Sequence, residues 1–304
     1  MTYRIALPEG GRLTTLDLIE PNSSAVQRFL RRHGLAGYEP STVAALLAAF
    51  EHAGPGFTFV DVGANIGLYS LLCAALFEPG GVLALEPTPD IADLAERLAA
   101  ANSLDIDVRR VAASKRSGTA MLNVADTSDV SNSLESGFKA SAHSLSVPTM
   151  TLDHMMLGAE IAPGVIKIDV EGHESAVLQG ARRVLEEHRP VLVVEVLNRR
   201  RGRLAGAIAE QLDGLGYHCY ELTPSPDWVR HGQPIARNAH RDWLLVPAPL
   251  GDDFIASWST WRDRVSVCTP DRNSRVPLVR TAQAALRRGG LQEVISAAKR
   301  FLRR

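Results

Sequence analysis

Four acidic residues stand where short apolar segments of this chain end, and they are the first candidates for chemistry. In order along the chain they are Asp61, Glu86, Asp169 and Glu195. The segments before them are rich in valine, isoleucine and leucine, which predicts buried strands. Parallel strands bring their carboxyl ends to one edge of a sheet, where open α/β folds bind ligands. Because burying unpaired like charges is costly, we expect a cationic ligand, a metal ion or Lys167 to offset them.

The first of these acids is followed by two glycines within the segment Asp61-Val62-Gly63-Ala64-Asn65-Ile66-Gly67. An apolar stretch at 68–77 is long enough for a helix, so the order strand, tight turn, helix predicts the opening of a nucleotide-binding βαβ unit. Gly63 allows backbone to approach a ligand closely, and the helix start offers unpaired N–H groups. Glu86, at the end of the next strand, can accept both hydroxyls of a ribose.

The glycine spacing bears on which nucleotide is bound. A dinucleotide-binding turn has the spacing G-x-G-x-x-G and carries its acid only on the second strand. This chain instead has D-x-G-x-N-x-G, with Asp61 already on the first strand. A carboxylate there suits a ligand that carries an ammonium group, which favours S-adenosylmethionine over NAD. An NAD-dependent oxidoreductase or epimerase of a sugar remains the first alternative, and an ordinary strand-to-helix turn remains the simplest reading of the glycines.

A second signature, Val-Ile-Lys-Ile-Asp-Val-Glu-Gly-His-Glu, occupies 165–174. Together with 61–67 and Glu86-Pro87 it resembles the FkbM family of S-adenosylmethionine-dependent O-methyltransferases, over roughly 36–247. The resemblance implies an α/β fold of the Rossmann-like methyltransferase class. Its seven-stranded, mostly parallel sheet would have the order 3-2-1-4-5-7-6, with the last strand antiparallel and helices on both faces. It also implies methyl transfer to a hydroxyl, which we expect to belong to a sugar of a glycan, glycolipid or glycosylated natural product.

The cofactor-binding residues follow from these segments and from the resemblance. In the resembled family, a Tyr-Glu-Pro-like element such as 38–40 belongs to a cap over the cofactor, although Tyr38 could simply pack on the following helix. A predicted strand at 107–113 ends at Ala112-Ala113-Ser114, where an adenine edge could meet backbone groups. Ser133 belongs to a polar cluster at 128–133 that could cover the sulfonium or form a solvated loop. The predicted set is Tyr38, Glu39, Asp61, Gly63, Ala64, Asn65, Gly67, Glu86, Pro87, Ala112, Ser133 and Asp169.

The chemistry of methyl transfer restricts the catalytic residues. The protein must align acceptor oxygen, methyl group and sulfur, exclude water, and take up the hydroxyl proton with a carboxylate or histidine. Glu171 is the first candidate for the base, because it lies just beyond the strand that carries Asp169. Asp169 would position the acceptor or face the cofactor. His173 is the second candidate, with a surface or capping role as its alternative, while Lys167 is expected to be an ion-pair partner and Glu174 to charge a helix start.

Two further features at this edge leave alternatives open. Asp169, Glu171 and Glu195 could hold Mg²⁺, as related antibiotic-sugar O-methyltransferases do with acids after the same two strands. Those enzymes have paired aspartates where this chain has Glu195-Val196, so we predict no metal and keep Mg²⁺ as the alternative. Four arginines at 199–203 would suit an acceptor with a phosphate or carboxylate, such as an acidic glycan, unless they form a solvated loop.

Composition excludes several classes of protein. The chain has 304 residues, a formal net charge of −1 and 45% hydrophobic residues, which argues against nucleic-acid binding. Its three cysteines, Cys73, Cys219 and Cys268, lack metal-ligand spacing and are predicted to be buried thiols of a reducing compartment. The N-terminus lacks a signal pattern and no long apolar run occurs, so we expect a cytoplasmic protein.

The chain divides into a predicted hairpin and helical cap at 1–50, a methyltransferase domain at 51–250 and a C-terminal extension at 251–304. Turn residues and apolar periodicity define the other elements. We predict a hairpin at 3–20, helices at 23–32, 43–50, 90–101, 174–187 and 204–215, and strands at 191–195, 218–222 and 243–246.

The extension ends in a basic amphipathic segment. Residues 272–304 hold nine arginines and lysines against one acid, Glu293. An apolar helical face is formed by Leu291, Val294, Ile295, Ala298, Phe301 and Leu302. We predict that 287–304 contacts an anionic membrane at its cytoplasmic face. The alternatives are packing on the protein itself or on a second copy, as in a homodimer. A scaffold without activity that recruits partners through this segment is the second functional alternative.

Overall fold

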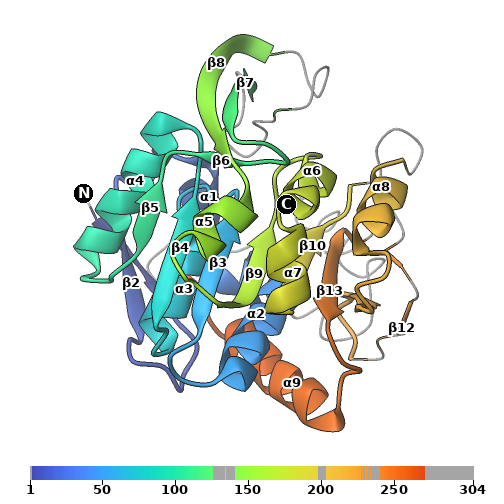
Figure 1. Cartoon of the computed structure of the whole chain (residues 1–304). Helices are drawn as coiled ribbons and strands as arrows, with labels where there is room; N and C mark the ends of the chain where they lie inside the picture. The colour runs from blue at the N-terminus through green and yellow to red at the C-terminus, as the bar shows by residue number, and fades with distance from the viewer. Residues whose placement is uncertain are drawn as a thin grey trace, which may run out of the picture.

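The computed structural model describes residues 2–125, 134, 141–197, 203–226, 228, 230–231, 233–234 and 240–270. Its described part contains a central eight-stranded sheet of order β12-β11-β13-β10-β9-β3-β4-β5 (Figure 1). The strands are β3 Thr58–Val62, β4 Gly81–Leu85, β5 Asp107–Arg109, β9 Pro163–Ile168, β10 Val191–Glu195, β11 His218–Glu221, β12 Arg230–His231 and β13 Asp242–Val246.

The predicted strand order is confirmed. Strands β5, β4, β3, β9 and β10 are parallel neighbours, and β13 runs antiparallel between β10 and β11. Counted along the chain, these strands have the order 3-2-1-4-5-7-6. Strand β12 extends the sheet beyond β11 and was not predicted, since two residues carry too short a pattern to recognise.

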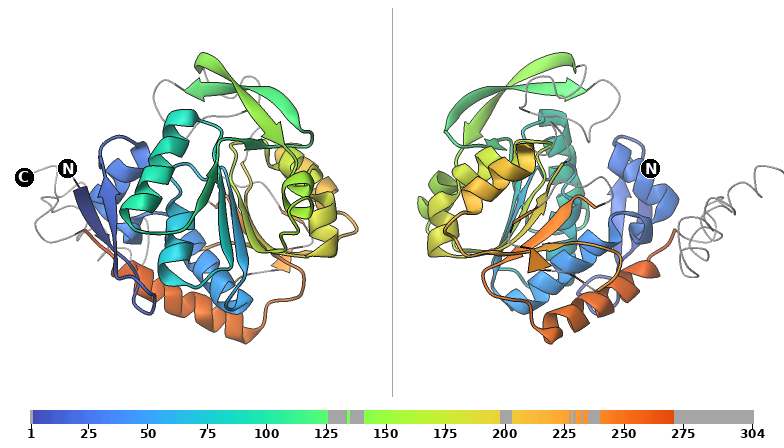
Figure 2. Two further views of the ribbon diagram at one scale, coloured as in Figure 1. Left: turned by 60° about the vertical axis from the view of Figure 1, so that its left-hand side comes forward. Right: turned by 90° about the vertical axis from the view of Figure 1, so that its right-hand side faces the viewer.

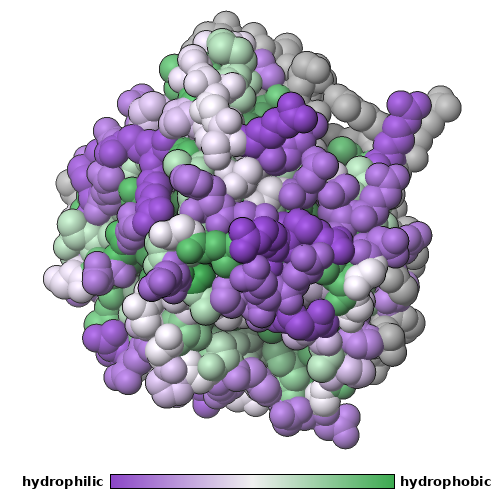
Figure 3. Space-filling model, in the orientation of Figure 1, coloured by the Kyte–Doolittle hydropathy of each residue, from purple (hydrophilic) through white to green (hydrophobic). Residues whose placement is uncertain are grey.

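Both faces of the sheet are buried. Successive residues of a strand point to opposite faces, and in β3 Phe59 belongs to one apolar cluster while Val60 belongs to the other. The first face is covered by α1 Ala25–His33, α2 Pro40–Ala53, α3 Leu68–Leu76, α4 Pro89–Ala101 and α9 Asp252–Ser266. The second is covered by α5 Leu152–Leu157, α6 Glu174–Gln179, α7 Arg182–Glu187 and α8 Arg203–Leu212. The outer surface in the first view is mostly hydrophilic, with small apolar areas between (Figure 3).

The N-terminal elements agree with the predictions. Strands β1 Thr2–Ala6 and β2 Thr15–Ile19 form an antiparallel hairpin. Ser24 caps α1 by accepting a hydrogen bond from the backbone N–H of Gln27 at 3.0 Å, and the helix ends at Gly34, whose φ is 64°. A short 3₁₀ helix, η1 Leu35–Gly37, then leads to α2. All three cysteines are buried, as predicted.

The predicted strand at 107–113 is wrong as a single element. The chain turns after β5, where the N–H of Val111 donates to the carbonyl of Arg109 at 2.9 Å. Beyond the turn, β6 Ala112–Ala113 joins a separate sheet of order β6-β8-β7 with β7 Gly118–Ala125 and β8 Ser141–Met150. Strands β7 and β8 pair as a long antiparallel hairpin, which projects from the molecule at the end opposite α9 (Figure 2). The cluster at 128–133, with Ser133, lies outside the described residues.

The predicted helix at 174–187 is two helices, α6 and α7. A side chain at Gly180 would meet the carbonyl oxygen of Ser114, since a Cβ there would lie 2.1 Å from it. The carboxylate of Asp153 accepts hydrogen bonds from the N–H groups of Arg183 at 3.2 Å and Val184 at 2.9 Å, and so caps α7. Tertiary contacts therefore interrupt a pattern that is continuous in the sequence.

Helix α9 was not expected from the sequence, and it packs along α2 (Figure 2). The indole N–H of Trp258 donates to the carbonyl of Ser41 at 3.1 Å, and that of Trp261 donates to Glu51 at 3.0 Å. The proposed division at residue 250 stays a prediction, and the basic segment 287–304 lies outside the described residues. Among the described helices, none is both long and apolar enough to cross a membrane.

Candidate active site

A cavity of about 460 Å³ opens at the carboxyl ends of β4, β3, β9 and β10. Residues of α1, η1 and β7 close it from the other side. Most of the predicted site residues lie on its wall. They are Tyr38, Glu39, Gly63, Asn65, Glu86, Pro87, Ala112, Asp169, Glu171, His173 and Glu195. The predicted residues therefore share one cavity at the predicted edge of the sheet, and their roles stay predictions.

The two sequence signatures meet through their backbones. Gly63 has a φ of 77°, and a Cβ at this position would lie 1.9 Å from the carbonyl oxygen of Asp169. The N–H of Asp169 donates to the carbonyl of Val62 at 3.0 Å. The glycine is thus required by the close approach of the chain after β9, in addition to the left-handed conformation that favours glycine.

Glu86 is held by the turn that follows β3. Its carboxylate accepts hydrogen bonds from the backbone N–H of Asn65 at 3.0 Å and of Thr88 at 2.8 Å, one on each oxygen. Burial raises the pKa of Glu86, and these two donors partly counteract the effect. Because each carboxylate oxygen can accept more than one hydrogen bond, both can also accept from a ligand in the cavity. This geometry matches the two hydroxyls of a ribose.

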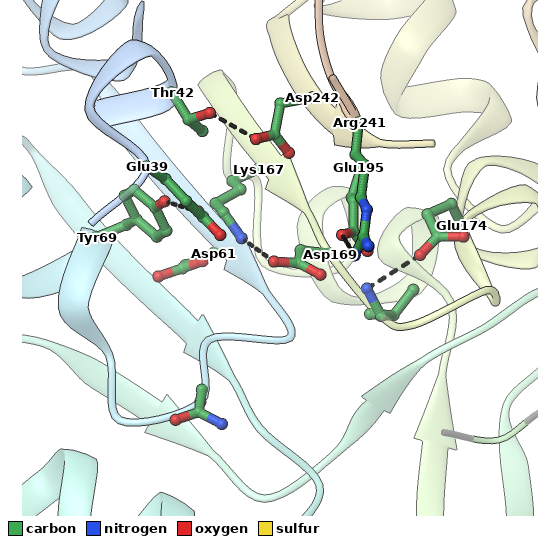
Figure 4. Close-up of polar contacts among 12 residues, drawn as sticks. Glu39, Thr42, Asp61, Tyr69, Lys167, Asp169, Glu174, Glu195, Arg241 and Asp242 are labelled. Carbon is green, nitrogen blue, oxygen red and sulfur yellow. Dashed lines mark hydrogen bonds and ion pairs between the residues drawn. The ribbon is translucent and has the colours of Figure 1, made fainter. Parts of the chain in front are cut away.

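Lys167 is the centre of a buried charge cluster behind the cavity (Figure 4). It is 3% exposed, donates to Asp169 at 2.9 Å and lies 4.7 Å from the ring centre of Tyr69. Burial lowers its pKa, but the carboxylates of Asp169, Asp61 and Glu39 raise it more strongly, so the net shift is upward. Lys167 is therefore charged, and its predicted role as an ion-pair partner is confirmed.

Three predicted cofactor residues, Asp61, Ala64 and Gly67, are not among the residues that line the cavity. Asp61 is fully buried and accepts from the N–H of Ser70 at 3.2 Å and from its hydroxyl at 2.9 Å. Burial raises the pKa of Asp61, against the opposing effects of Lys167 and Ser70. Asp61 thus faces the start of α3 and the lysine, and its contact with a cofactor stays a prediction.

Glu39 and Tyr38 connect the N-terminal cap to the site. Glu39 has a left-handed backbone with φ of 39°, directly before α2, and it accepts a hydrogen bond from the hydroxyl of Tyr69 at 2.5 Å. Burial raises the pKa of Glu39 to about 7, and nearby Asp242 and Asp169 add to the shift. Tyr38 lines the cavity and packs edge-on against the Phe29 ring of α1, while its role in a cap over a cofactor stays a prediction.

The loop after β9 is held by hydrogen bonds to a buried glutamate. Glu174 is fully buried, and one of its oxygens accepts from the N–H of Val170 at 3.2 Å and of Gly172 at 2.9 Å. Burial raises the pKa of Glu174 to about 7. Between these two donors, Glu171 has a φ of 55°, a conformation that few side chains adopt without support. Glu174 therefore does more than charge a helix start, because it fixes the loop that presents Glu171.

His173 lies on the same wall and reaches across to the second sheet. Its Nε2 is hydrogen-bonded to the hydroxyl of Ser114 at 2.9 Å. Ser114 directly follows β6, so this contact links the loop after β9 to the hairpin that borders the cavity. His173 remains the second candidate for the base.

At the far end of the cavity, Glu195 lies beside Arg241, a residue that the sequence analysis missed. The two side chains are 3.6 Å apart, and Glu195 is 13% exposed. Burial raises the pKa of Glu195 to about 10, with further contributions from Asp169 and Glu171. The available signal was the antiparallel direction of β13, which places the residues before it at the carboxyl edge. The apolar lining from Val26, Phe29 and Leu122 was also missed.

The described part of the chain shows no preformed set of ligands for Mg²⁺, the alternative considered above. Within the described residues, no three histidine, cysteine, aspartate or glutamate side chains are grouped as metal ligands are. Asp169 is paired with Lys167 instead. The residues present do not fit the metal, and the arginine-rich loop after Glu195 lies mostly outside the described part of the chain.

Comparison with known proteins finds a relative of this chain. A hexuronic acid methyltransferase, AglP, of Haloferax volcanii is 32% identical over 136 residues. The match covers 44% of this chain and 53% of AglP, so the chain spans about half the length of that relative.

Two solved structures show limited likeness. The methyltransferase FkbM of Methylobacillus flagellatus is 20% identical, with a TM-score of 0.40, and the match covers 63% of this chain and 43% of that one. An S-adenosylmethionine-dependent methyltransferase of Agrobacterium tumefaciens is 12% identical, with a TM-score of 0.45 and coverage of 81% and 70%. Likenesses as low as these carry no argument about the site. The family model for the methyltransferase FkbM domain, however, matches residues 61–219, more than half of the 304 residues. Its span includes both signatures, and the chain therefore belongs to the FkbM methyltransferase family.

Proposed function

We propose that this protein is an S-adenosylmethionine-dependent O-methyltransferase that methylates a hydroxyl of a sugar. The observation that carries the proposal is the excess of carboxylates around one cavity. Glu39, Glu86, Asp169 and Glu171 line it, while Lys167 lies behind them and offsets part of their charge. A site of this kind favours a ligand with positive charge, and S-adenosylmethionine carries both a sulfonium and an ammonium group.

The residues present fit the cofactor in shape as well as in charge. Glu86 offers two carboxylate oxygens at the end of β4 for a ribose. Next to it, Leu85, Val111 and Ala113 provide apolar wall for the faces of an adenine ring. Asp169 lies two strands away along the cavity, so the aminoacyl part would extend from β4 across β3 toward β9. This path follows the edge where open parallel sheets bind ligands.

When bound, S-adenosylmethionine supplies an electrophilic methyl group. The protein's own task is to place an acceptor hydroxyl in line with it and to remove the hydroxyl proton. Glu171 is our candidate for the proton acceptor, because it lies on the wall and its loop is fixed by buried Glu174. Asp169 is held by Lys167 in an orientation suited to positioning the acceptor or the cofactor. Residues of α1 and η1 contribute largely apolar surface to the cavity wall.

A sugar acceptor is supported by the name of the relative from Haloferax volcanii, a hexuronic acid methyltransferase. Calorimetric titration of the protein with S-adenosylmethionine and, in a separate arm, with NAD tests the cofactor. Transfer of a radiolabelled methyl group to a panel of sugars then tests the reaction. We expect binding and transfer with S-adenosylmethionine and no binding of NAD.

Two matched variants sharpen this test. Glu86→Gln should weaken S-adenosylmethionine binding by about tenfold or more, because a hydrogen bond to a charged group contributes about 1.5–3 kcal/mol. Glu96→Gln, on the exposed surface of α4 where it pairs with Arg110, should leave the affinity unchanged. Equal affinities of both folded variants, or tight binding of NAD alone, would refute the proposed cofactor.

A further inference from the structure

Arg241 stands out among the described residues of the cavity wall, because it is the only arginine or lysine there. Its backbone carbonyl accepts a hydrogen bond from the N–H of Val196 at 2.7 Å, which anchors it at the end of β10. Its side chain is 58% exposed and therefore reaches into the open part of the cavity. The backbone of Arg241 is thus fixed by a hydrogen bond, while its guanidinium is accessible.

The charge of this guanidinium is poorly compensated. Its neighbour Glu195 is 3.6 Å away, beyond normal hydrogen-bond distance, and no other described side chain forms an ion pair with it. One oxygen of Glu195 is buried without a hydrogen-bond partner among the described residues. Burial and the neighbouring carboxylates raise the pKa of Glu195, which weakens its ability to neutralise the arginine. The next residue, Asp242, accepts a hydrogen bond from the hydroxyl of Thr42 at 2.6 Å and acts on Arg241 through its charge, without forming an ion pair with it.

The position of Arg241 separates it from the nucleoside end of the cavity. Glu86 follows β4 and Glu195 ends β10, and these strands are three positions apart in the sheet. With neighbouring strands about 4.8 Å apart, the two ends lie roughly 14 Å from each other. A cofactor whose ribose is bound by Glu86 and whose aminoacyl part reaches Asp169 leaves the end at β10 for the acceptor.

We propose that Arg241 binds a carboxylate of the acceptor, so that the preferred substrate is a uronic acid rather than a neutral sugar. This proposal builds on the function proposed above and assigns its substrate class to a residue. A guanidinium binds a carboxylate through two parallel N–H donors, which fixes orientation as well as position. When it is protonated, the carboxyl of Glu195 can donate a further hydrogen bond to the same group.

The surrounding charges set the direction in which the acceptor enters. Asp169 and Glu171 line the cavity after the neighbouring strand β9 and repel an anion. The carboxylate of the sugar is therefore held at the outer, arginine side, while its ring hydroxyls point inward to Glu171. The same arrangement gives a neutral sugar no charged partner at the rim. Selectivity would come from one strong contact together with repulsion at the other end of the acceptor.

The test compares Arg241→Gln and Arg241→Lys with the wild-type protein. The probes are the methyl glycosides of glucuronic, galacturonic and mannuronic acid and of the corresponding neutral hexoses. Their binding is measured by calorimetry in the presence of S-adenosylhomocysteine, and their methylation by radiolabel transfer. Arg183→Gln, an exposed arginine on α7 that pairs with Glu187, is the matched control.

We expect the wild-type protein to bind and methylate at least one uronate at least tenfold better than its neutral counterpart. Arg241→Gln should lower kcat/KM for that uronate about 10- to 100-fold, leave the neutral sugar unchanged and keep the affinity for S-adenosylmethionine. Arg241→Lys should recover part of the loss, and Arg183→Gln should have no effect.

Three results would overturn this inference. They are equal treatment of uronates and neutral sugars by the wild-type protein, absence of uronate binding, and an Arg241→Gln variant that weakens the cofactor instead of the acceptor. The last result would assign the arginine to the carboxylate of S-adenosylmethionine. Failure of the proposed function itself looks different, because the wild-type protein would then not bind S-adenosylmethionine at all.

Discussion

Replacing Lys167 by methionine removes the ammonium group that faces the buried carboxylates at the sheet edge. Lys167 is 3% exposed and donates to Asp169 at 2.9 Å, while Asp61 and Glu39 also act on its pKa. Methionine retains the length and the apolar contacts of the side chain. Breaking a buried ion pair by removing one partner costs about 3–5 kcal/mol, because the other charge stays buried without compensation. Against a typical stability of about 5–15 kcal/mol, this loss is large.

The sign of the pH dependence provides the sharper test. The pKa of Lys167 is raised above its ordinary value, so its contribution is complete at every pH below about 10 and is lost only in strongly alkaline solution. Without the lysine, the pKa values of Asp61 and Glu39 rise further. A carboxyl with a raised folded-state pKa stabilises the protein as the pH falls through that value. The deficit of Lys167→Met should therefore shrink between about pH 7 and pH 4.5.

Urea unfolding of wild type, Lys167→Met, Asp61→Asn and the double variant at several pH values measures these effects. Asp61→Asn removes one of the buried charges without touching the cavity wall, so the double variant should be more stable than the sum of the single losses predicts. Lys115→Met, at an exposed position, should change stability by less than about 0.5 kcal/mol. A deficit below about 1 kcal/mol at pH 7, or one that stays constant with pH, would refute the charge-cluster reasoning.

Four further predictions follow from the same structure and sequence. Gly63→Ala should lower the free energy of unfolding by about 2 kcal/mol or more, measured by urea titration, because its Cβ would meet a carbonyl oxygen at 1.9 Å. The control Gly54→Ala, at a similar φ of 73° with open space around it, should lower the free energy of unfolding by less. Glu171→Gln should lower turnover about a hundredfold while the affinity for S-adenosylmethionine in calorimetry is kept, and near wild-type turnover would place the base elsewhere. Burial raises the pKa of Glu39 to about 7, so folding favours the protonated carboxyl. The contribution of Glu39 to the free energy of unfolding is therefore complete below its unfolded pKa of 4.5 and is lost as the pH rises through 7. A Glu39→Gln protein should lack this part of the pH dependence of Tm. The full chain should sediment with anionic liposomes at low salt and a chain ending near residue 276 should not, and equal behaviour of the two would remove the membrane prediction.

The resemblance carried by the two signatures predicted the order of the sheet, and the residue pattern predicted the edge at which the candidate site lies. Apolar segments that end in acids mark buried parallel strands, and their carboxyl ends must meet at one edge. For that reason Glu86, Asp169 and Glu195 could be placed together without a structure. The two signatures also carried the family resemblance, which the family model confirms over residues 61–219.

Tertiary structure alone decided which of these residues face the cavity. Asp61 has the same local pattern as Glu86, yet α3 and Lys167 enclose it, while Glu86 stays on the wall. Spacing along a strand cannot predict this difference, because it depends on which neighbour packs over each side chain. Arg241 was missed for a related reason, since the segment before β13 reaches the site only through the antiparallel pairing of β13 with β10.

The splitting of two predicted elements has the same origin. The pattern at 174–187 is continuously helical, but Asp153 and the carbonyl of Ser114 interrupt it from distant parts of the chain. The strand at 107–113 divides because its last residues pair with β8 and not with the main sheet. Local sequence sets the preference of each segment, and long-range contacts outweigh it where a hydrogen-bond partner or a close backbone approach is available only in the folded chain.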